Sequence, residues 1–305
     1  MRLTFRVTAC VVLLLSLAAA FGKPAGARSA QELLPEESAA KAKLILRQTI
    51  GALGGQAYLD VHESDCDGKI AQFGSNGELM GYTPFRDLWL LPDKNRTEYI
   101  SKGQNTIAGF LMGADGLAIT HGGIMITVYS GDEGWMLDKG GVTNQPDDLV
   151  KTFTEQVKTG LNNVLRLRMN EPGVESSYAG PDLIDMKEAE WIEFTDRDHR
   201  TMRLAVDKST HLPLRWVVET RDPETREHTD NTIAYTQYIA MDGVKTPLSQ
   251  VRSHNDRKVS QTFLTGCKYN SNLAPDLFTR ASLDRVAPGV MKKGYIDNKD
   301  NKNQK

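Results

Sequence analysis

Residues 190–219 read EWIEFTDRDHRTMRLAVDKSTHLPLRWVVE, and apolar and polar side chains alternate in three short segments of this stretch. Ile192 and Phe194 alternate with polar residues in the first segment, and segments 201–207 and 214–219 repeat the pattern. Successive side chains of a strand point to opposite faces, so three consecutive strands share one apolar and one charged face. RDHR and DKSTHLP are the hairpin connections between them. The apolar face comprises Ile192, Phe194, Met202, Leu204, Val206, Leu214, Trp216 and Val218.

Turn signals extend the antiparallel pattern through the first half of the chain. Segments rich in Gly, Asn and Asp separate short apolar runs there, as expected between the strands of an antiparallel sheet. The segments are GSNG at 74–77, LPDKN at 91–95, GADG at 113–116, HGG at 121–123 and SGDEG at 130–134. The sequence therefore predicts a mainly β fold.

Two segments have helical periodicity instead. Residues 36–54 carry an apolar stripe with a 3.6-residue period, and Gly54 and Gly55 end it. Residues 145–169 carry a second stripe, with Pro146 in the first turn. Amphipathic helices among strands pack their stripe on a sheet face, which makes the fold class α+β. The stripes comprise Ala42, Leu46, Thr49, Ile50 and Leu53 in the first segment and Leu149, Phe153, Val157, Leu161, Val164 and Leu165 in the second.

The two ends of the chain carry different signals. Residues 1–27 combine Arg2 and Arg6 with an apolar run shorter than a membrane span, which predicts a cleaved signal peptide and no remaining transmembrane helix. Residues 28–284 are predicted to form one domain. Residues 285–305 end in KKGYIDNKDNKNQK and are predicted to be a disordered polar tail.

The charge and the cysteines restrict the functional classes. A net charge of -2 provides no basic field for binding nucleic acid. Cys66 and Cys267 remain after removal of the signal peptide, which contains Cys10, and an even pair outside the cytoplasm favours a disulfide. Closing a loop of about 200 residues contributes about 5 kcal/mol in the chain-entropy model. The alternative is a metal site with His62 and Asp65, which lacks the paired spacing of zinc ligands.

Specific catalytic motifs are absent from the sequence. Neither G-x-S-x-G nor H-E-x-x-H nor a phosphate-binding glycine loop occurs. His199 beside Asp196 and Asp198 is a candidate acid/base group, yet all three fall in a predicted hairpin turn, where solvated polar residues are common. Asp132 and Glu133 occupy a tight turn as well, and a calcium site would need further carboxylates.

Large aromatic and sulfur-containing side chains are the remaining candidates for a binding site. All four tryptophans fall in predicted strands, where such rings either fill a core or line a cavity. Several methionines would make a cavity wall adaptable. The sequence leaves both alternatives open. The residues are Trp89, Trp135, Trp191 and Trp216, with Met112, Met125 and Met202.

Several motifs together resemble the LolA-like superfamily, the outer-membrane lipoprotein-sorting proteins and related periplasmic proteins. In these proteins a strand ending Asp-x-x-Thr-x-Leu-Pro turns into the next strand, as Asp207 to Pro213 do here. The resemblance covers most of residues 40–280. The motifs are ALGG at 52–55, GDEGWMLDKGG at 131–141, VDKSTHLPLRW at 206–216, YTQYIAMDGVKTPLSQVRSHN at 235–255 and LAPDLF at 273–278.

The resemblance implies a strongly curved, half-open antiparallel sheet, a half-barrel of about eleven strands with helices packed on the concave face. In the sorting proteins this arrangement encloses a cavity for acyl chains. One position departs from the family pattern: Leu91 precedes Pro92, where the sorting proteins have an arginine that helps to latch the lid. The implied fold therefore has stronger support than lipoprotein sorting itself.

Three functional hypotheses follow. The first is a periplasmic carrier or binding protein for an acyl chain, lipid or lipoprotein, with no cofactor and no catalysis. The second is an envelope structural or protein-interaction module with a filled core. The third is an enzyme that uses Asp196, Asp198 and His199. For the carrier, the predicted cavity wall comprises Ile192, Phe194, Met202, Leu204, Leu214, Trp216 and Val218.

Overall fold

A computed structural model describes residues 33–101, 106–108, 118–120, 123–221 and 227–300, and the predicted signal peptide lies outside them. The compact unit that begins at Leu34 contains all the elements below. The helices are α1 (Pro35–Leu53), α2 (Gln56–Leu59), α3 (Asp147–Thr159), α4 (Leu161–Asn163), the π-helical turn η1 (Val164–Arg168), the 3₁₀ turn η2 (Pro275–Phe278) and α5 (Arg280–Asp300).

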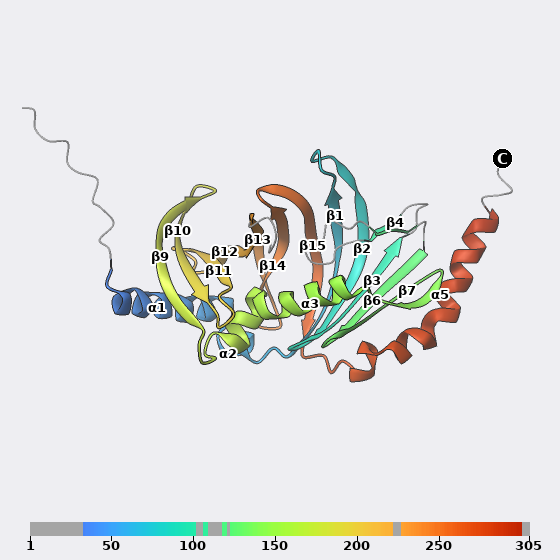
Figure 1. Cartoon of the computed structure of the whole chain (residues 1–305), viewed down its shortest axis with the longest axis horizontal. Helices are drawn as coiled ribbons and strands as arrows, with labels where there is room; N and C mark the ends of the chain where they lie inside the picture. Colours follow the sequence, from blue (N-terminus) through green and yellow to red (C-terminus); the bar gives the residue numbers. More distant parts are fainter. Residues whose placement is uncertain (1–32, 102–105, 109–117, 121–122, 222–226, 301–305) are drawn as a thin grey trace, which may run out of the picture. The chain divides into compact units, whose positions relative to one another are not determined.

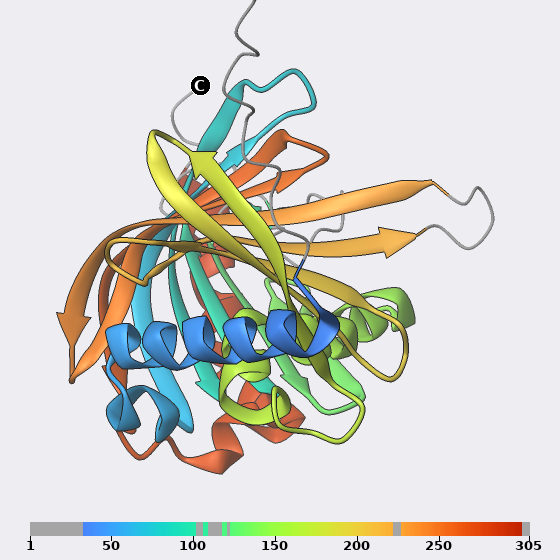
Figure 2. The same cartoon turned by 90° about the vertical axis from the view of Figure 1, so that its left-hand side faces the viewer.

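The strands form one open, curved sheet and a separate hairpin of β4 and β5 (Figures 1 and 2). The strands are β1 (Glu63–Phe73), β2 (Leu79–Leu90), β3 (Lys94–Ser101), β4 (Thr106–Ala108), β5 (Ala118–Thr120), β6 (Gly123–Ser130), β7 (Glu133–Asp138), β8 (Gly141–Asn144), β9 (Glu175–Ile184), β10 (Lys187–Thr195), β11 (Thr201–Asp207), β12 (Pro213–Arg221), β13 (His228–Met241), β14 (Val244–His254) and β15 (Arg257–Tyr269).

The main sheet has 13 strands, in the order β8, β7, β6, β3, β2, β1, β15, β14, β13, β12, β11, β10 and β9. All neighbouring strands are antiparallel, as the sequence predicts. The expected count of about eleven is too low, because short segments such as β8 also pair with the edge of the sheet. Pairing of β1 with β15 brings the first and last strands side by side.

The alternating stretch forms β10, β11 and β12 with the predicted hairpins. Ile192 lies opposite Leu204, which lies opposite Trp216. Leu214 departs from the predicted face. A β-bulge shifts the β11–β12 register beside it, and Leu214 packs with Ala205 and Trp191 on the opposite face. A bulge places one extra residue in a strand and breaks the two-residue alternation there.

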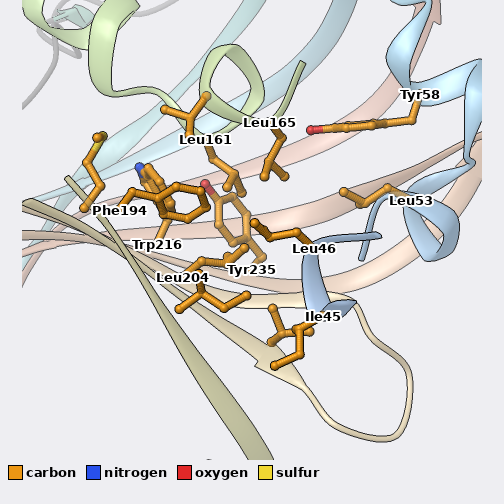
Figure 3. Close-up of a cluster of buried hydrophobic side chains, with 14 of the residues drawn as sticks. Ile45, Leu46, Leu53, Tyr58, Leu161, Leu165, Phe194, Leu204, Trp216 and Tyr235 are labelled. Carbon is orange, nitrogen blue, oxygen red and sulfur yellow. The ribbon is translucent and has the colours of Figure 1, made fainter. Parts of the chain in front are cut away.

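The core beneath this stretch is formed with α1, α4 and η1 (Figure 3). α1 begins with Pro35 and two glutamates in its first turn, which favour a helix N-terminus. Its predicted stripe is largely buried. Gly54 ends the helix with φ +132°, and a Cβ there would lie 2.4 Å from the Gly243 carbonyl oxygen. Glycine is therefore required where α1 meets the β13–β14 turn.

The second predicted helix is interrupted at Gly160. This residue has extended backbone angles between α3 and α4. Because of this interruption, α3 and the α4–η1 segment pack against different groups of residues. Phe153 of α3 stacks on Tyr129, with ring centroids 4.7 Å apart, whereas Leu161 and Leu165 join the core with α1.

The C-terminal segment corrects the sequence prediction of a disordered tail from residue 285. α5 continues to Asp300, and Leu283, Ala287 and Val290 are buried against a cluster that includes Leu88 and Val128. Their spacing of four and three residues forms an apolar stripe, which the abundance of lysine and asparagine further on obscures in the sequence. α5 thus covers one face of β6, β7 and β8.

The predicted disulfide is present between Cys66 and Cys267. The two cysteines are directly opposed partners on β1 and β15, with their Cα atoms 4.0 Å apart. The bond therefore fixes the register at which the N-terminal and C-terminal parts of the sheet meet.

Candidate ligand cavity

A cavity of about 290 Å³ lies beside the Cys66–Cys267 bond, between the sheet and the helical segment around Gly160. Strands β1, β2, β3, β13, β14 and β15 supply most of its lining. Leu53 of α1 and Tyr58 of α2 also line it. Leu161 of α4 and Arg166 of η1 are also part of the lining.

Pairs of opposed residues on β2 and β3 form one wall of the cavity. Every second residue of each strand lines it, as the two-residue period of a strand requires. The wall mixes three aromatic rings with three polar groups. The opposed pairs are Phe85 with Tyr99, Asp87 with Thr97 and Trp89 with Asn95.

Asp87 is the acidic centre of this wall. Its Oδ2 accepts a hydrogen bond from the Trp89 indole at 2.8 Å, and its Oδ1 accepts from Asn95 Nδ2 at 2.9 Å and Thr97 Oγ1 at 2.7 Å. Burial raises the pKa of the Asp87 carboxyl, and these hydrogen bonds oppose the rise. Both carboxylate oxygens of Asp87 thus accept hydrogen bonds from neighbouring side chains. Asp87 therefore holds Trp89, Asn95 and Thr97 in place in the wall.

Arg166 and Arg252 are the two guanidinium groups of the lining. Burial lowers the pKa of Arg166 and lowers that of Arg252 to about 10. Burial also raises the pKa of Tyr58 to about 12, while the charge of Arg166 opposes this rise. The cavity therefore places partly desolvated positive charge beside aromatic rings.

The predicted wall residues lie elsewhere, which corrects the sequence-based interpretation. None of the seven is part of the cavity lining. Ile192, Phe194, Met202, Leu204 and Trp216 are at most 1% exposed and pack against α1, α4 and η1; Val218 packs against the same cluster. Leu214 lies on the other face. Helical side chains fill the space above this part of the sheet, so the predicted wall is packed core.

The acid/base candidates form a structural network. Asp196 is 3% exposed; its Oδ2 accepts hydrogen bonds from Arg200 at 3.0 Å and Arg168 at 3.3 Å. Burial opposes ionisation of Asp196, but hydrogen bonds and the charge of Arg200 lower its pKa. Asp198 also pairs with Arg200. No hydrogen bond or ion pair among the described residues joins His199 to either carboxylate, so the arrangement lacks a base positioned by an acid.

The alternative metal site is incompatible with the structure. Cys66 is bonded to Cys267, and Asp65 accepts two hydrogen bonds from Arg86 at 2.8 and 2.6 Å. The described residues contain no cluster of three metal-binding side chains. Asp132 lies in the turn between β6 and β7, as predicted, whereas Glu133 is the first residue of β7.

The tryptophans divide between the two alternatives that the sequence left open. All four lie in strands, as predicted. Trp89 lines the cavity, and Trp216 fills the core. Met125 and Met202 are both buried, and Met112 lies outside the described residues. The signal for the cavity in the sequence is the run Phe85, Asp87 and Trp89, in which an acid interrupts an aromatic face.

Comparisons with known proteins concern the fold. No family model and no curated protein matches the sequence. Solved structures similar to the chain include a domain assigned to outer membrane lipoprotein-sorting proteins from Vibrio parahaemolyticus, at 12% identity, covering 81% of this chain and 100% of that chain with a TM-score of 0.48.

Two further solved structures are similar to the chain at comparable identity, coverage and TM-score. A LolA superfamily protein from Nitrosomonas europaea is 12% identical over 79% of this chain and 99% of that chain, with a TM-score of 0.49. A DUF1329 family protein from Desulfovibrio piger is 11% identical over 79% of this chain and 98% of that chain, also with a TM-score of 0.49.

Among the described helices, none has the length and apolar character of a membrane span.

Proposed function

We propose that the protein is a periplasmic carrier or binding protein for an acylated, apolar ligand, which it holds in the cavity between β1–β3, β13–β15 and the α3–η1 segment. The observation that carries the proposal is the cavity itself, whose lining combines aromatic and aliphatic side chains with polar ones. The cysteines support an oxidising compartment, because such disulfides persist outside the cytoplasm. The signal peptide predicted from residues 1–27 is consistent with this location.

The size of the cavity suits one chain of a ligand. Ligand pockets typically measure about 300–1,000 Å³, and the cavity of about 290 Å³ is just below this range. A water molecule, similar in size to a methylene group, occupies about 30 Å³ in the liquid, so about ten methylene groups fit. Burying them at ~0.8 kcal/mol each gives about 8 kcal/mol before the cost of association.

A cavity-filling substitution tests the proposal. Leu264→Trp enlarges a side chain of the lining. We expect this substitution to lower the affinity for a fluorescent fatty acid by about tenfold or more. The matched control is Leu183→Trp, because Leu183 is 63% exposed and is not part of the lining. Thermal unfolding of both variants checks that each retains the fold.

Native mass spectrometry of the protein purified from its own envelope provides the complementary measurement. A bound lipid on the parent protein that is absent from Leu264→Trp supports the carrier. If the parent protein carries no lipid and does not bind the fluorescent fatty acid, the carrier proposal is wrong.

The alternative is a non-enzymatic envelope structural or protein-interaction module. The observation that favours it is the filled core over β10–β12, where the helices leave no room for a ligand above Trp216 and Phe194. This alternative would gain support if the purified protein carried no lipid.

A further inference from the structure

Arg166 occupies an unusual position in the helical segment that covers the cavity. η1 is a π-helical turn, closed by a hydrogen bond from the Met169 amide to the Val164 carbonyl at 2.8 Å. Such turns occur frequently at functional sites. Val164 and Leu165 are buried in the core, which fixes the turn, and Arg166 of the same turn lines the cavity.

The contacts of Arg166 position its guanidinium without neutralising it. Nε donates to the Tyr58 carbonyl at 2.9 Å, and the guanidinium carbon lies 4.2 Å from the centre of the Tyr58 ring. No carboxylate in the described part of the chain forms an ion pair with it, and no other hydrogen bond from its guanidinium to a described residue occurs. Four of its five N–H donors therefore have no acceptor among these residues.

The acids of the lining are engaged by other partners. The lining contains Glu63 and Asp87 beside the three cations Arg166, Lys245 and Arg252. Both oxygens of Glu63 accept from the Leu273 amide, at 3.0 and 2.9 Å. Asp87 accepts from three neighbouring side chains. Both acids of the lining thus have hydrogen-bond partners other than Arg166, which lies beside aromatic rings in the same cavity.

A cation removed from water without a counterion is costly, and an anion that binds beside it recovers this cost. The planar guanidinium is suited to two parallel hydrogen bonds with a carboxylate or a phosphate. A neutral acyl ligand would leave the donors of Arg166 without partners when it displaces water from the cavity.

We infer that the cavity selects an amphiphile with an anionic oxygen head group, a carboxylate or a phosphate, and that Arg166 binds this head group while the apolar tail contacts Phe85, Trp89 and Tyr99. The inference rests on the proposed function, which it extends by defining the class of ligand. It assigns a specificity role to Arg166.

Three ligands with the same ten-carbon tail test the inference: decanoate, decyl phosphate and the neutral decanol. A hydrogen bond to a charged group contributes about 1.5–3 kcal/mol, so we expect the parent protein to bind at least one anion about tenfold or more tightly than decanol, measured by calorimetry at pH 7.5. Comparison of decanoate with decyl phosphate then identifies the head group.

Arg166→Gln should remove this preference, so that decanol and the two anions bind this variant with affinities within about threefold of one another. The control is Arg47→Gln, because Arg47 is exposed on α1 and is not part of the lining. Equal affinity of the parent protein for all three ligands would overturn the inference, and so would a preference that persists in Arg166→Gln. The first of these results needs no variant, so it decides the matter even if Arg166→Gln fails to fold.

The experiment also separates the inference from the proposed function. If decanol binds as tightly as the anions, the carrier proposal stands and the selectivity is wrong. If none of the three ligands binds, the carrier proposal itself is wrong, and the selectivity falls with it.

Discussion

Trp216→Ala is expected to lower the free energy of unfolding by about 3–5 kcal/mol, the usual cost of truncating a large buried aromatic side chain. Trp216 is 1% exposed, and its indole donates to the Thr159 carbonyl at 2.9 Å. Its ring contacts Phe194 edge to face, with centroids 5.8 Å apart. Alanine would leave a cavity in the core and an unsatisfied carbonyl at the end of α3.

Urea unfolding measures this loss as a lower midpoint with an unchanged slope. The control is Trp191→Ala, since Trp191 lies on the other face of β10, is only partly buried and bonds to Asp182 near the surface. We expect a smaller loss for this variant. A Trp216→Ala protein that is as stable as the parent but no longer binds an acyl ligand would show that Trp216 lines the binding site after all.

Removal of the disulfide is expected to have the second large effect. Cys66 and Cys267 are 201 residues apart in sequence, and loss of a native disulfide from a small secreted domain typically costs about 2–5 kcal/mol. The main contribution is the larger conformational freedom of the unfolded chain once the bond is absent. We therefore expect Cys66→Ala/Cys267→Ala to unfold at a clearly lower urea concentration than the oxidised protein.

A reductant provides the control for this measurement. It should destabilise the parent protein and leave the double variant unchanged, because the variant has no bond to reduce. A double variant within about 0.5 kcal/mol of the oxidised parent, the range of neutral surface substitutions, would contradict the prediction.

The sequence predicts those parts of the fold in which one face is buried. β10 and β11 alternate between buried apolar and partly buried polar residues over 192–195 and 201–204, and α1 shows its stripe because its buried residues lie on one side of the helix. The glycines after α1 also fix its end correctly. These elements need only local information, namely periodicity and a turn residue.

The cavity could not be predicted in the same way. Its lining comes from strands that are distant in sequence, and both faces of β2 carry buried residues: Leu88 belongs to the cluster formed with η2 and α5, and Phe85, Asp87 and Trp89 line the cavity. Alternation therefore does not identify the side that faces a ligand. The sequence predicts an apolar face over β10–β12. The interruption of the helix at Gly160, however, determines which part of the sheet the helical segment covers.

Quenching of single tryptophans by a brominated fatty acid tests the location of the ligand most directly. One variant retains Trp89, the tryptophan of the cavity lining, and another retains Trp216 of the packed core; phenylalanine replaces the other three tryptophans in each. We predict that the bound chain quenches Trp89 strongly and leaves Trp216 nearly unchanged, because quenching by bromine requires near contact. Quenching of Trp216 without quenching of Trp89 would place the ligand over β10–β12 and contradict the account.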